Sequence, residues 1–240
     1  GNGVDETVKN TADGSFTFSE IAYTLEDIGE HIYTVTEVND GKPGYTYDAT
    51  EYKIIATVAD AGDGSLTVTY TVNGTESGDI SFKNEYAADG SVQFGGTKTL
   101  TGTDLQADQF SFTLTDGDGV IETVQNDADG KFSFTEIKYT LDDVGKHTYT
   151  VTEVNEGKAG YTYDATEYEI IVMVTDAGDG TLNVTYTVNG TEGGDIAFKN
   201  EYAADGSVQF GGTKTLTGTD LQADQFSFTL TGDGVNEIVK

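Results

Sequence analysis

The chain repeats itself, and the length of the repeat constrains its fold more than any other feature of the sequence. Residues 82–115 return unchanged as residues 198–231, an identical stretch of 34 residues at an offset of 116, from position 82 to position 198. Shorter stretches return at the same offset, such as YTVTEV, which begins at Tyr33 and again at Tyr149. Solenoid repeats have periods of roughly 20–50 residues, so a repeat this long predicts a whole domain per copy.

The frame of the repeat divides the chain into three segments. Residues 1–86 align with position 117 onward, so we expect a partial module that lacks its first strands. Residues 87–202 form one complete module, and residues 203–240 supply the first strands of a following module. We call these segments the first, middle and last repeat. Either the sequence is an excerpt from a longer array, which we favour, or the last repeat of one copy completes the first repeat of another by strand donation.

Short runs of β-branched and aromatic residues dominate the middle repeat. Examples are FSFTL, KFSFTEI, HTYTVTEV, EYEIIVMV, TLNVTYTV and DIAFKNEY, in which apolar and polar side chains alternate. Turn sequences such as DGDG, NDADG and DAGDG separate them, and no helical period extends beyond about one turn. The pattern predicts an all-β fold of tandem immunoglobulin-like antiparallel β-sandwich modules of about 116 residues. Only EYAADGS links one module to the next, which favours a stiff connection.

The composition argues against several classes of function. The chain carries 42 acidic against 12 basic residues, all of them lysine, for a formal net charge of -30, so it repels nucleic-acid phosphates and anionic lipid. Its 11% aromatic residues argue against the disorder that acidic sequences favour. It has no cysteine, no apolar run near the ~20 residues that span a bilayer, and no leader pattern at its start. We expect no nucleic acid partner and no membrane insertion in this segment.

Three polar residues of the middle repeat fall on strand faces that are otherwise apolar. Successive side chains of a strand point to opposite faces, and by this parity Lys98 in VQFGGTKTL, Glu153 in HTYTVTEV and Asn200 in DIAFKNEY point inward. Burying an unpaired charge costs several kcal/mol. One explanation is a hydrogen-bonded polar cluster in the core. Another is a bulge at Gly95 and Gly96 that turns Lys98 outward.

A third explanation is chemical and uses the same burial. Desolvation lowers the pKa of a lysine and raises that of a glutamic acid, so a proton shared between them leaves Lys98 as a neutral nucleophile. Protonated Glu153 then donates a hydrogen bond to the side-chain carbonyl of Asn200 and polarises it for attack. Ammonia leaves, and an amide joins the first strand to the last. The reaction runs once per molecule, so it is single-turnover self-crosslinking and the chain is not an enzyme.

Three separated motifs carry a resemblance to a known family. GTKTLTG, YTVTEV and FKNEY, in this order and near these separations, resemble the isopeptide-linkage domains of Gram-positive, streptococcal-type major pilins and, more distantly, the B-type stalk domains of collagen-binding adhesins. The resemblance covers the middle repeat and both partial ones. It implies an isopeptide bond between Lys98 and Asn200, with Glu153 as the acid and base. The equivalents of these residues in the partial repeats are Glu37, Asn84 and Lys214.

The resemblance and the identical repeats together predict a structural stalk or shaft module of a bacterial cell-surface adhesin or pilus. We expect it to be extracellular, on the cell surface or cell wall-anchored, to need no cofactor, and to have neighbouring copies or modules in a filament or stalk as partners. Two alternatives are an adhesin module that binds a host or matrix component through its loops and a filament subunit completed by a neighbouring copy's strands. Binding loops diverge between repeats, so the identical stretch favours the spacer.

Two other groups of residues deserve comparison with known sites. NDADGKFSFTEI places Asp127, Asp129 and Glu136 at ligand positions of a calcium-binding loop, but a glutamine stands at the first position. Its Asp-Gly pair favours a hairpin turn, so we expect no metal. His31 and His147 occupy equivalent positions at the start of a strand. We interpret them as residues with a packing or rim role at the end of a strand, because no nucleophile motif accompanies them.

Overall fold

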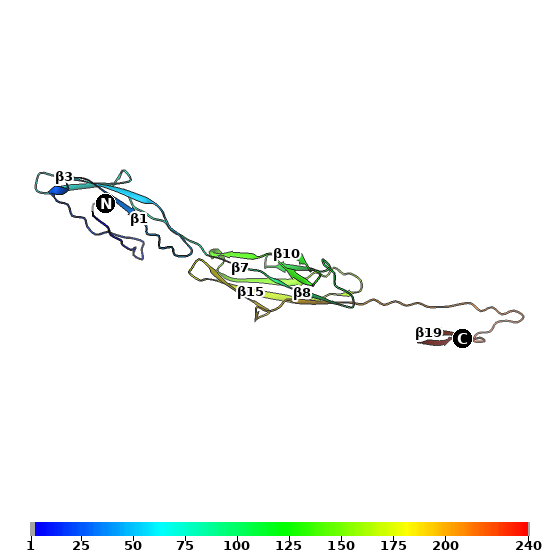
Figure 1. Ribbon diagram of the computed structural model, residues 1–240. Coiled ribbons are helices and arrows are strands. Elements are labelled where there is room, and N and C mark those ends of the chain that lie inside the picture. Colours follow the sequence, from blue (N-terminus) through cyan, green and yellow to red (C-terminus); the bar gives the residue numbers. More distant parts are fainter. Residues whose placement is uncertain (1–2, 240) are drawn as a thin grey trace. The chain divides into compact units, whose positions relative to one another are not determined.

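A computed structural model describes residues 3–239, in which nearly all the regular secondary structure is β-strand (Figure 1). It divides into two compact units, one up to Tyr202 and one from Ala203 onward. Within residues 3–239 the only helical segments are the single 3-10 turns η1 (Leu25–Asp27) and η2 (Leu141–Asp143). No helix in this range is long and apolar enough to cross a membrane. The all-β fold class predicted from strand alternation is therefore confirmed.

The middle repeat contains two sheets and one additional strand pair. The larger sheet is antiparallel and has the strand order β10 (Val120–Gln125), β9 (Ser111–Thr115), β13 (Gly145–Glu153), β15 (Glu167–Asp176), β16 (Leu182–Val188), β17 (Thr191–Glu192). The second sheet has the order β11 (Lys131–Ser133), β8 (Gly95–Thr101), β18 (Ala197–Tyr202), β14 (Tyr161–Thr162). The pair consists of β12 (Ile137–Thr140) and β7 (Asp89–Val92).

The first long strand of the middle repeat lies beside its last strand. β8 and β18 run parallel, with Lys98 opposite Phe198 and Leu100 opposite Asn200. Parallel strands need a long crossover connection, and here nearly the whole repeat forms it. The two strands that carry the inward-pointing lysine and asparagine are therefore direct neighbours.

Aromatic side chains from the two sheets pack against each other in one core. Phe112 of β9 stacks on Phe132 of β11, with ring centroids 3.9 Å apart, and its ring lies 5.3 Å from that of Phe198 on β18. Val151 of β13 and Val172 of β15 are fully buried in the same core. Burial of side chains this large is the main source of stability in such a fold.

Two segments differ from the sequence-based expectation. KFSFTEI, expected as one strand, is divided between β11 and β12, which belong to different sheets. EYAADGS, expected as a link, is mostly part of the folded structure: Glu85–Tyr86 forms β6, Ala88 lies in the core, and β7 begins at Asp89. The physical reason is the same in both cases, since the ladder partners of a strand come from distant sequence and local pattern does not reveal them.

The first repeat keeps only part of this architecture. Its main sheet has the order β1 (Gly29–Thr36), β3 (Glu51–Asp60), β4 (Leu66–Val72), β5 (Thr75–Glu76), and β2 (Tyr45–Thr46) pairs with β6 (Glu85–Tyr86). Residues 3–28 contain no strand, although their equivalents in the middle repeat form β10, β11 and β12. The strands that pair with those three have no counterpart in the first repeat, and an isolated strand is not stable in water. Phe134 is 1% exposed, whereas its equivalent Phe18 is 37% exposed.

The unit from Ala203 onward contains one hairpin, formed by β19 (Phe228–Gly232) and β20 (Val235–Val239). Almost all of its side chains are exposed.

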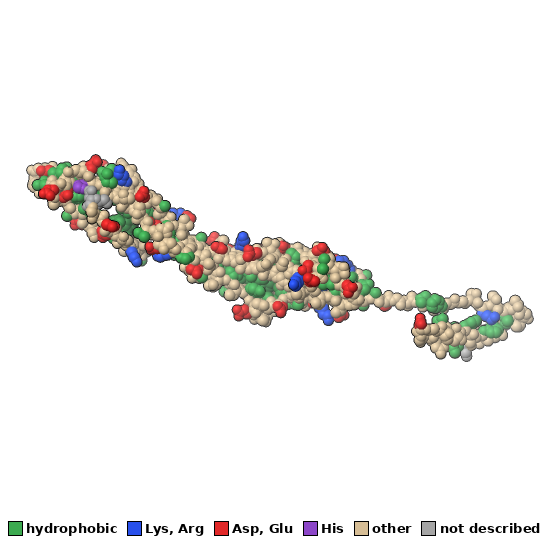
Figure 2. Space-filling model, viewed as in Figure 1, with side chains coloured by type: hydrophobic (Ala, Val, Ile, Leu, Met, Phe, Trp, Pro, Cys, Tyr) green, Lys and Arg blue, Asp and Glu red, His purple; other side chains and the backbone are tan. Residues whose placement is uncertain are grey.

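Acidic side chains are scattered over the visible face of the molecule in Figure 2 and do not gather in one patch.

Candidate functional site

The three polar residues identified by parity are all buried in the middle repeat. Lys98 is 2% exposed and Asn200 is 0% exposed, and the side chain of Glu153 is fully buried. The bulge that would turn Lys98 outward does not form. β8 runs without interruption from Gly95 to Thr101, and a side chain at Gly96 would lie 2.5 Å from the Ile196 carbonyl oxygen, so this glycine allows close contact between β8 and the chain entering β18.

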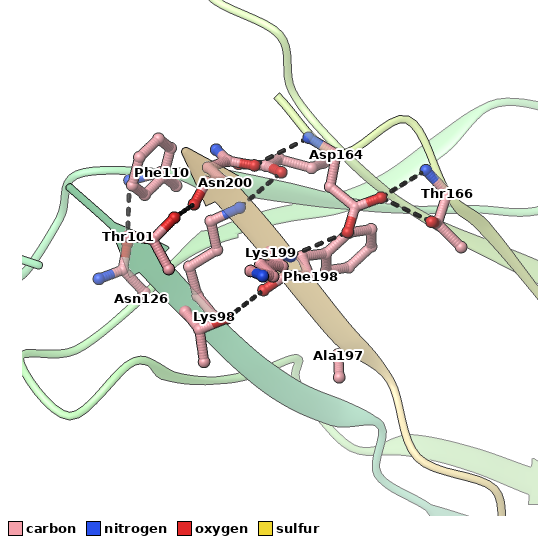
Figure 3. Close-up of polar contacts among 12 residues, drawn as sticks. Lys98, Thr101, Phe110, Asn126, Asp164, Thr166, Ala197, Phe198, Lys199 and Asn200 are labelled. Carbon is pink, nitrogen blue, oxygen red and sulfur yellow. Dashed lines mark hydrogen bonds and ion pairs between the residues drawn. The ribbon is translucent and has the colours of Figure 1, made fainter. Parts of the chain in front are cut away.

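The Glu153 carboxylate connects the lysine to the asparagine. Lys98 Nζ donates to Glu153 Oε2 at 2.7 Å, and Asn200 Nδ2 donates to Glu153 Oε1 at 2.6 Å. Lys98 and Asn200 extend from the neighbouring strands β8 and β18 (Figure 3), and Glu153 reaches them from β13 of the other sheet. Each carboxylate oxygen thus contacts a different nitrogen.

Burial perturbs the pKa of both charged groups. It lowers the pKa of Lys98 below its usual range, and the ion pair with Glu153 offsets only part of this effect. Burial also raises the pKa of Glu153, against the lowering effect of Lys98 and Asn200. Both shifts favour the neutral forms of the pair. Lys98 Nζ lies over the buried ring of Phe110, 4.7 Å from the ring centroid.

A fourth residue, Asp164, holds the carbonyl oxygen of Asn200. The backbone N–H of Asp164 donates to Asn200 Oδ1 at 2.8 Å. The Asp164 side chain fixes this loop: Oδ1 accepts from the Thr166 N–H and hydroxyl at 2.9 and 2.6 Å, and Oδ2 accepts from the Lys199 N–H at 2.8 Å. Figure 3 shows the loop beside the end of β18.

This geometry differs from the mechanism expected from the sequence in one respect. Glu153 contacts the amide nitrogen of Asn200, and the N–H of Asp164 contacts its carbonyl oxygen. The sequence analysis missed Asp164 because a backbone N–H leaves no mark in a residue pattern. The available signal was the D-x-T sequence, which is typical of an aspartate that closes a turn on its own backbone.

The first repeat contains the same arrangement without a lysine. Asn84 Nδ2 donates to Glu37 Oε1 at 2.6 Å, and the N–H of Asp48 donates to Asn84 Oδ1 at 2.9 Å. In the unit from Ala203 onward, Lys214 Nζ lies 4.7 Å from the ring of Phe226, at the distance found between Lys98 and its aromatic neighbour.

The remaining sequence candidates have local structural contacts. Asp127 Oδ1 accepts from the N–H groups of Asp129 and Lys131 at 2.9 and 2.7 Å and so shapes a hairpin turn. Glu136 accepts a hydrogen bond from the Ser91 hydroxyl instead of joining the aspartates. Residues 3–239 contain no group of three His, Cys, Asp or Glu side chains placed to hold a metal ion.

The two histidines make equivalent contacts in the two repeats. The His147 ring contacts the Asp143 carbonyl oxygen through Nε2 at 2.7 Å and packs on Tyr139 with centroids 5.1 Å apart. His31 contacts the Asp27 carbonyl oxygen at 2.6 Å. The packing or rim role predicted for both histidines agrees with these contacts.

Comparison with known proteins identifies the family. Residues 2–87 and 94–203 match the model of the FctA family, described as a Spy0128-like isopeptide containing domain. Among solved structures, the chain is similar to the major pilin from Streptococcus pyogenes, with 22% identity over 78% of this chain and 74% of that chain and a TM-score of 0.30. A single-residue variant of that pilin gives 22% identity, coverage of 78% and 73%, and a TM-score of 0.29.

No curated protein matches the chain. The resemblance to the isopeptide domains of streptococcal-type major pilins, first indicated by three sequence motifs, is confirmed. Since the family model covers most of the chain, the chain belongs to the FctA family of Spy0128-like isopeptide-containing domains.

Proposed function

We propose that the middle repeat is a structural shaft or stalk module of a bacterial cell-surface pilus or adhesin, locked by an autocatalytic isopeptide bond between Lys98 and Asn200. In this proposal residues 87–202 are one complete module. Residues 1–86 belong to a module whose first strands are not in this sequence, and residues 203–240 are the first strands of another. The location on the surface of a Gram-positive cell is part of the same proposal.

One observation carries the chemistry: the buried carboxyl of Glu153 contacts the nucleophile and the leaving group at the same time. Lys98 Nζ lies 2.7 Å from Oε2 and Asn200 Nδ2 lies 2.6 Å from Oε1. A purely structural ion pair between Lys98 and Glu153 makes the same contact between amine and carboxylate, but it does not require a carboxamide beside the carboxylate. General acid–base catalysis requires that the group be within hydrogen-bond reach of both proton-transfer sites.

The reaction follows from these contacts. Glu153 accepts a proton from Lys98 through Oε2, and the neutral Nζ attacks Cγ of Asn200. The C=O electron pair moves onto Oδ1 and returns as the bond from Cγ to Nδ2 breaks. Nζ loses two protons in total: one completes the departing ammonia by way of Oε1, and the other remains on Glu153. An amide between Lys98 and Asn200 is left.

The N–H of Asp164 has a defined role in this scheme. Negative charge develops on Asn200 Oδ1 when Nζ adds to Cγ, and a donor already placed at that oxygen stabilises the charge without reorganisation. Asp164 N is such a donor at 2.8 Å. The turn that its own side chain closes on Thr166 and Lys199 holds it in position, so we assign Asp164 as a positioning residue.

The intact mass of the purified protein tests the proposal. We expect a deficit of one ammonia molecule for the middle repeat, lost in Lys98→Ala and in Glu153→Ala. The control is Lys199→Ala, because Lys199 neighbours Asn200 on β18 but points to solvent. Protease digestion should yield a branched peptide that joins Lys98 to Asn200. A folded protein of unmodified mass would rule out the bond and leave only a β-sandwich with a buried polar cluster.

The two alternatives to a spacer predict different behaviour. A filament subunit completed by a neighbouring copy predicts a ladder of covalent multimers that survives boiling in detergent and grows with protein concentration. A spacer module predicts monomers under the same conditions. An adhesin module predicts saturable binding to a host matrix component, which substitutions in the loop at 155–160 would weaken.

A further inference from the structure

Tyr86, at the end of the first repeat, contacts a loop of the middle repeat. Its hydroxyl donates to Asp176 Oδ1 at 2.8 Å and accepts from the Gly180 N–H at 3.3 Å. The hydrogen bond to Asp176 raises the pKa of Tyr86. The ring packs against Tyr45 with centroids 4.8 Å apart. Asp176 and Gly180 both belong to the segment that connects β15 to β16, residues 176–181, which we call the DAGDG loop.

Two glycines face each other across the same contact. A Cβ built on Gly180 would lie 2.6 Å from the nitrogen and 2.7 Å from Cα of Gly44. A Cβ built on Gly44 would lie 2.6 Å from a ring carbon of Tyr86 and 2.7 Å from Gly180 Cα. Real Cβ atoms do not approach other heavy atoms this closely, so the two backbones meet at a distance that only glycine permits.

The chain between the repeats continues the contact. The N–H of Ala87 donates to the Gly44 carbonyl oxygen at 2.9 Å, and Asp89 forms a parallel bridge with Thr181 of the DAGDG loop. Gly90 then packs against Leu182, where an added Cβ would lie 2.9 Å from the leucine Cβ. The segment expected as a link is therefore tied to both repeats.

Both halves of this contact recur in the repeated sequence. Tyr202 and Gly160 repeat the tyrosine half at the end of the middle repeat, and the ring of Tyr202 lies 4.8 Å from that of Tyr161. The first repeat carries its own copy of the loop half, with Asp60 and Gly64. There it borders an open groove of about 510 Å³, lined also by Tyr23 and Leu66.

We propose that this contact is a built joint, in which the terminal tyrosine and Gly44 of one repeat lock onto the DAGDG loop of the next, where Gly180 faces Gly44. The two halves differ, so the contact is head-to-tail and continues without closing. The partner that each free half fits is another repeat of the same sequence. The joint is independent of the proposed isopeptide bond, since none of its residues contacts Lys98, Glu153 or Asn200 in the contacts described above.

A spin-label distance measurement tests the joint in the full chain. The protein has no cysteine, so labels at Thr69→Cys and Thr185→Cys, two exposed and equivalent strand positions, report the distance from one repeat to the next. We expect one narrow distance distribution in the parent, and a clearly broader one in Gly180→Ala, because its Cβ overlaps Gly44.

The repeat supplies matched controls. Gly64→Ala changes the equivalent residue, which has a similar backbone φ of +89° against +83° and no atom within 4 Å of the added carbon, so the distribution should stay narrow. Tyr86→Phe should broaden it and Tyr202→Phe should not. A parent distribution as broad as that of Gly180→Ala would overturn the joint, and so would equal broadening by Gly180→Ala and Gly64→Ala.

Discussion

The contribution of the proposed bond to stability can be isolated with a double-mutant cycle at Lys98 and Asn200. The bond closes a loop from position 98 to position 200, and the chain-entropy treatment of a crosslink gives about 4.7 kcal/mol for a loop of about 100 residues. Asn200→Ala removes this bond together with the contacts to Glu153 and Asp164. Those hydrogen bonds contribute roughly 1–3 kcal/mol each, so the single substitution alone does not separate the two effects.

Repeating Asn200→Ala in a Lys98→Met background separates the effect of the bond from that of the hydrogen bonds. Lys98→Met keeps the volume of the buried side chain and removes the nucleophile, so no bond forms and Asn200→Ala then costs only its hydrogen bonds. Each single variant loses the crosslink and the double variant loses it only once. We therefore expect a coupling free energy of about 4–5 kcal/mol between the two positions.

Amide hydrogen exchange of β15 measures the free energy of unfolding in each of the four proteins. Ile170, Val172 and Val174 of this strand are fully buried in the middle repeat, so their amides exchange only through its global unfolding. Intact mass on the same samples records which proteins have lost ammonia. A coupling below about 1 kcal/mol would refute the crosslink, since contacts made through a shared carboxyl account for a coupling of that size.

Three further predictions concern the polar site of the middle repeat and its apolar core. The pH profile of the rate of bond formation should be bell-shaped, with both limbs between 4.5 and 10.5, the usual pKa values of Glu and Lys, because burial raises the pKa of Glu153 and lowers that of Lys98. The rate is followed by mass in urea-solubilised chains that are refolded at each pH. Limbs at the two usual pKa values would contradict the role of burial. Asp164→Ala should slow bond formation by roughly tenfold to a hundredfold, since a preplaced oxyanion donor contributes a rate factor of up to ~10²–10³. The control Asp48→Ala opens the equivalent turn of the first repeat and should leave the rate unchanged. Equal rates of bond formation in both variants would remove Asp164 from the mechanism. Phe134→Ala should destabilise the middle repeat by about 3–5 kcal/mol, but the equivalent Phe18→Ala should destabilise the first repeat by under about 1 kcal/mol because that ring is 37% exposed. Urea unfolding of the two variants measures this difference. Similar losses of unfolding free energy would contradict the exposed placement of Phe18.

Strand parity was sufficient to find the lysine, the glutamate and the asparagine. Alternation is a local property of each strand, and large apolar neighbours such as Phe94, Val151 and Phe198 mark which face is inside. Parity also predicted the all-β fold. It gave no distances, so the shared contact of two nitrogens with one carboxyl emerged only from the packing of β8 and β18 against β13.

Other features depend on contacts between distant segments and were beyond the sequence. Asp164 acts through a backbone N–H that any residue possesses. Residues 4–9 of the first repeat correspond to β10 of the middle repeat, yet only the latter form a strand, because only there does β9 stand beside them. The tyrosine and glycine contacts between repeats belong to the same class, since a glycine in a turn sequence looks alike whether or not another backbone faces it.

The parallel pairing of β8 and β18 determines how the middle repeat responds when its ends are pulled apart. Force on the chain before Gly95 and after Tyr202 acts along the two strands in opposite directions, so every hydrogen bond of their ladder is sheared at once. An antiparallel pair pulled from one end would instead open like a zipper, one bond after another. This strand order makes rupture a single collective event, even before any covalent link is considered.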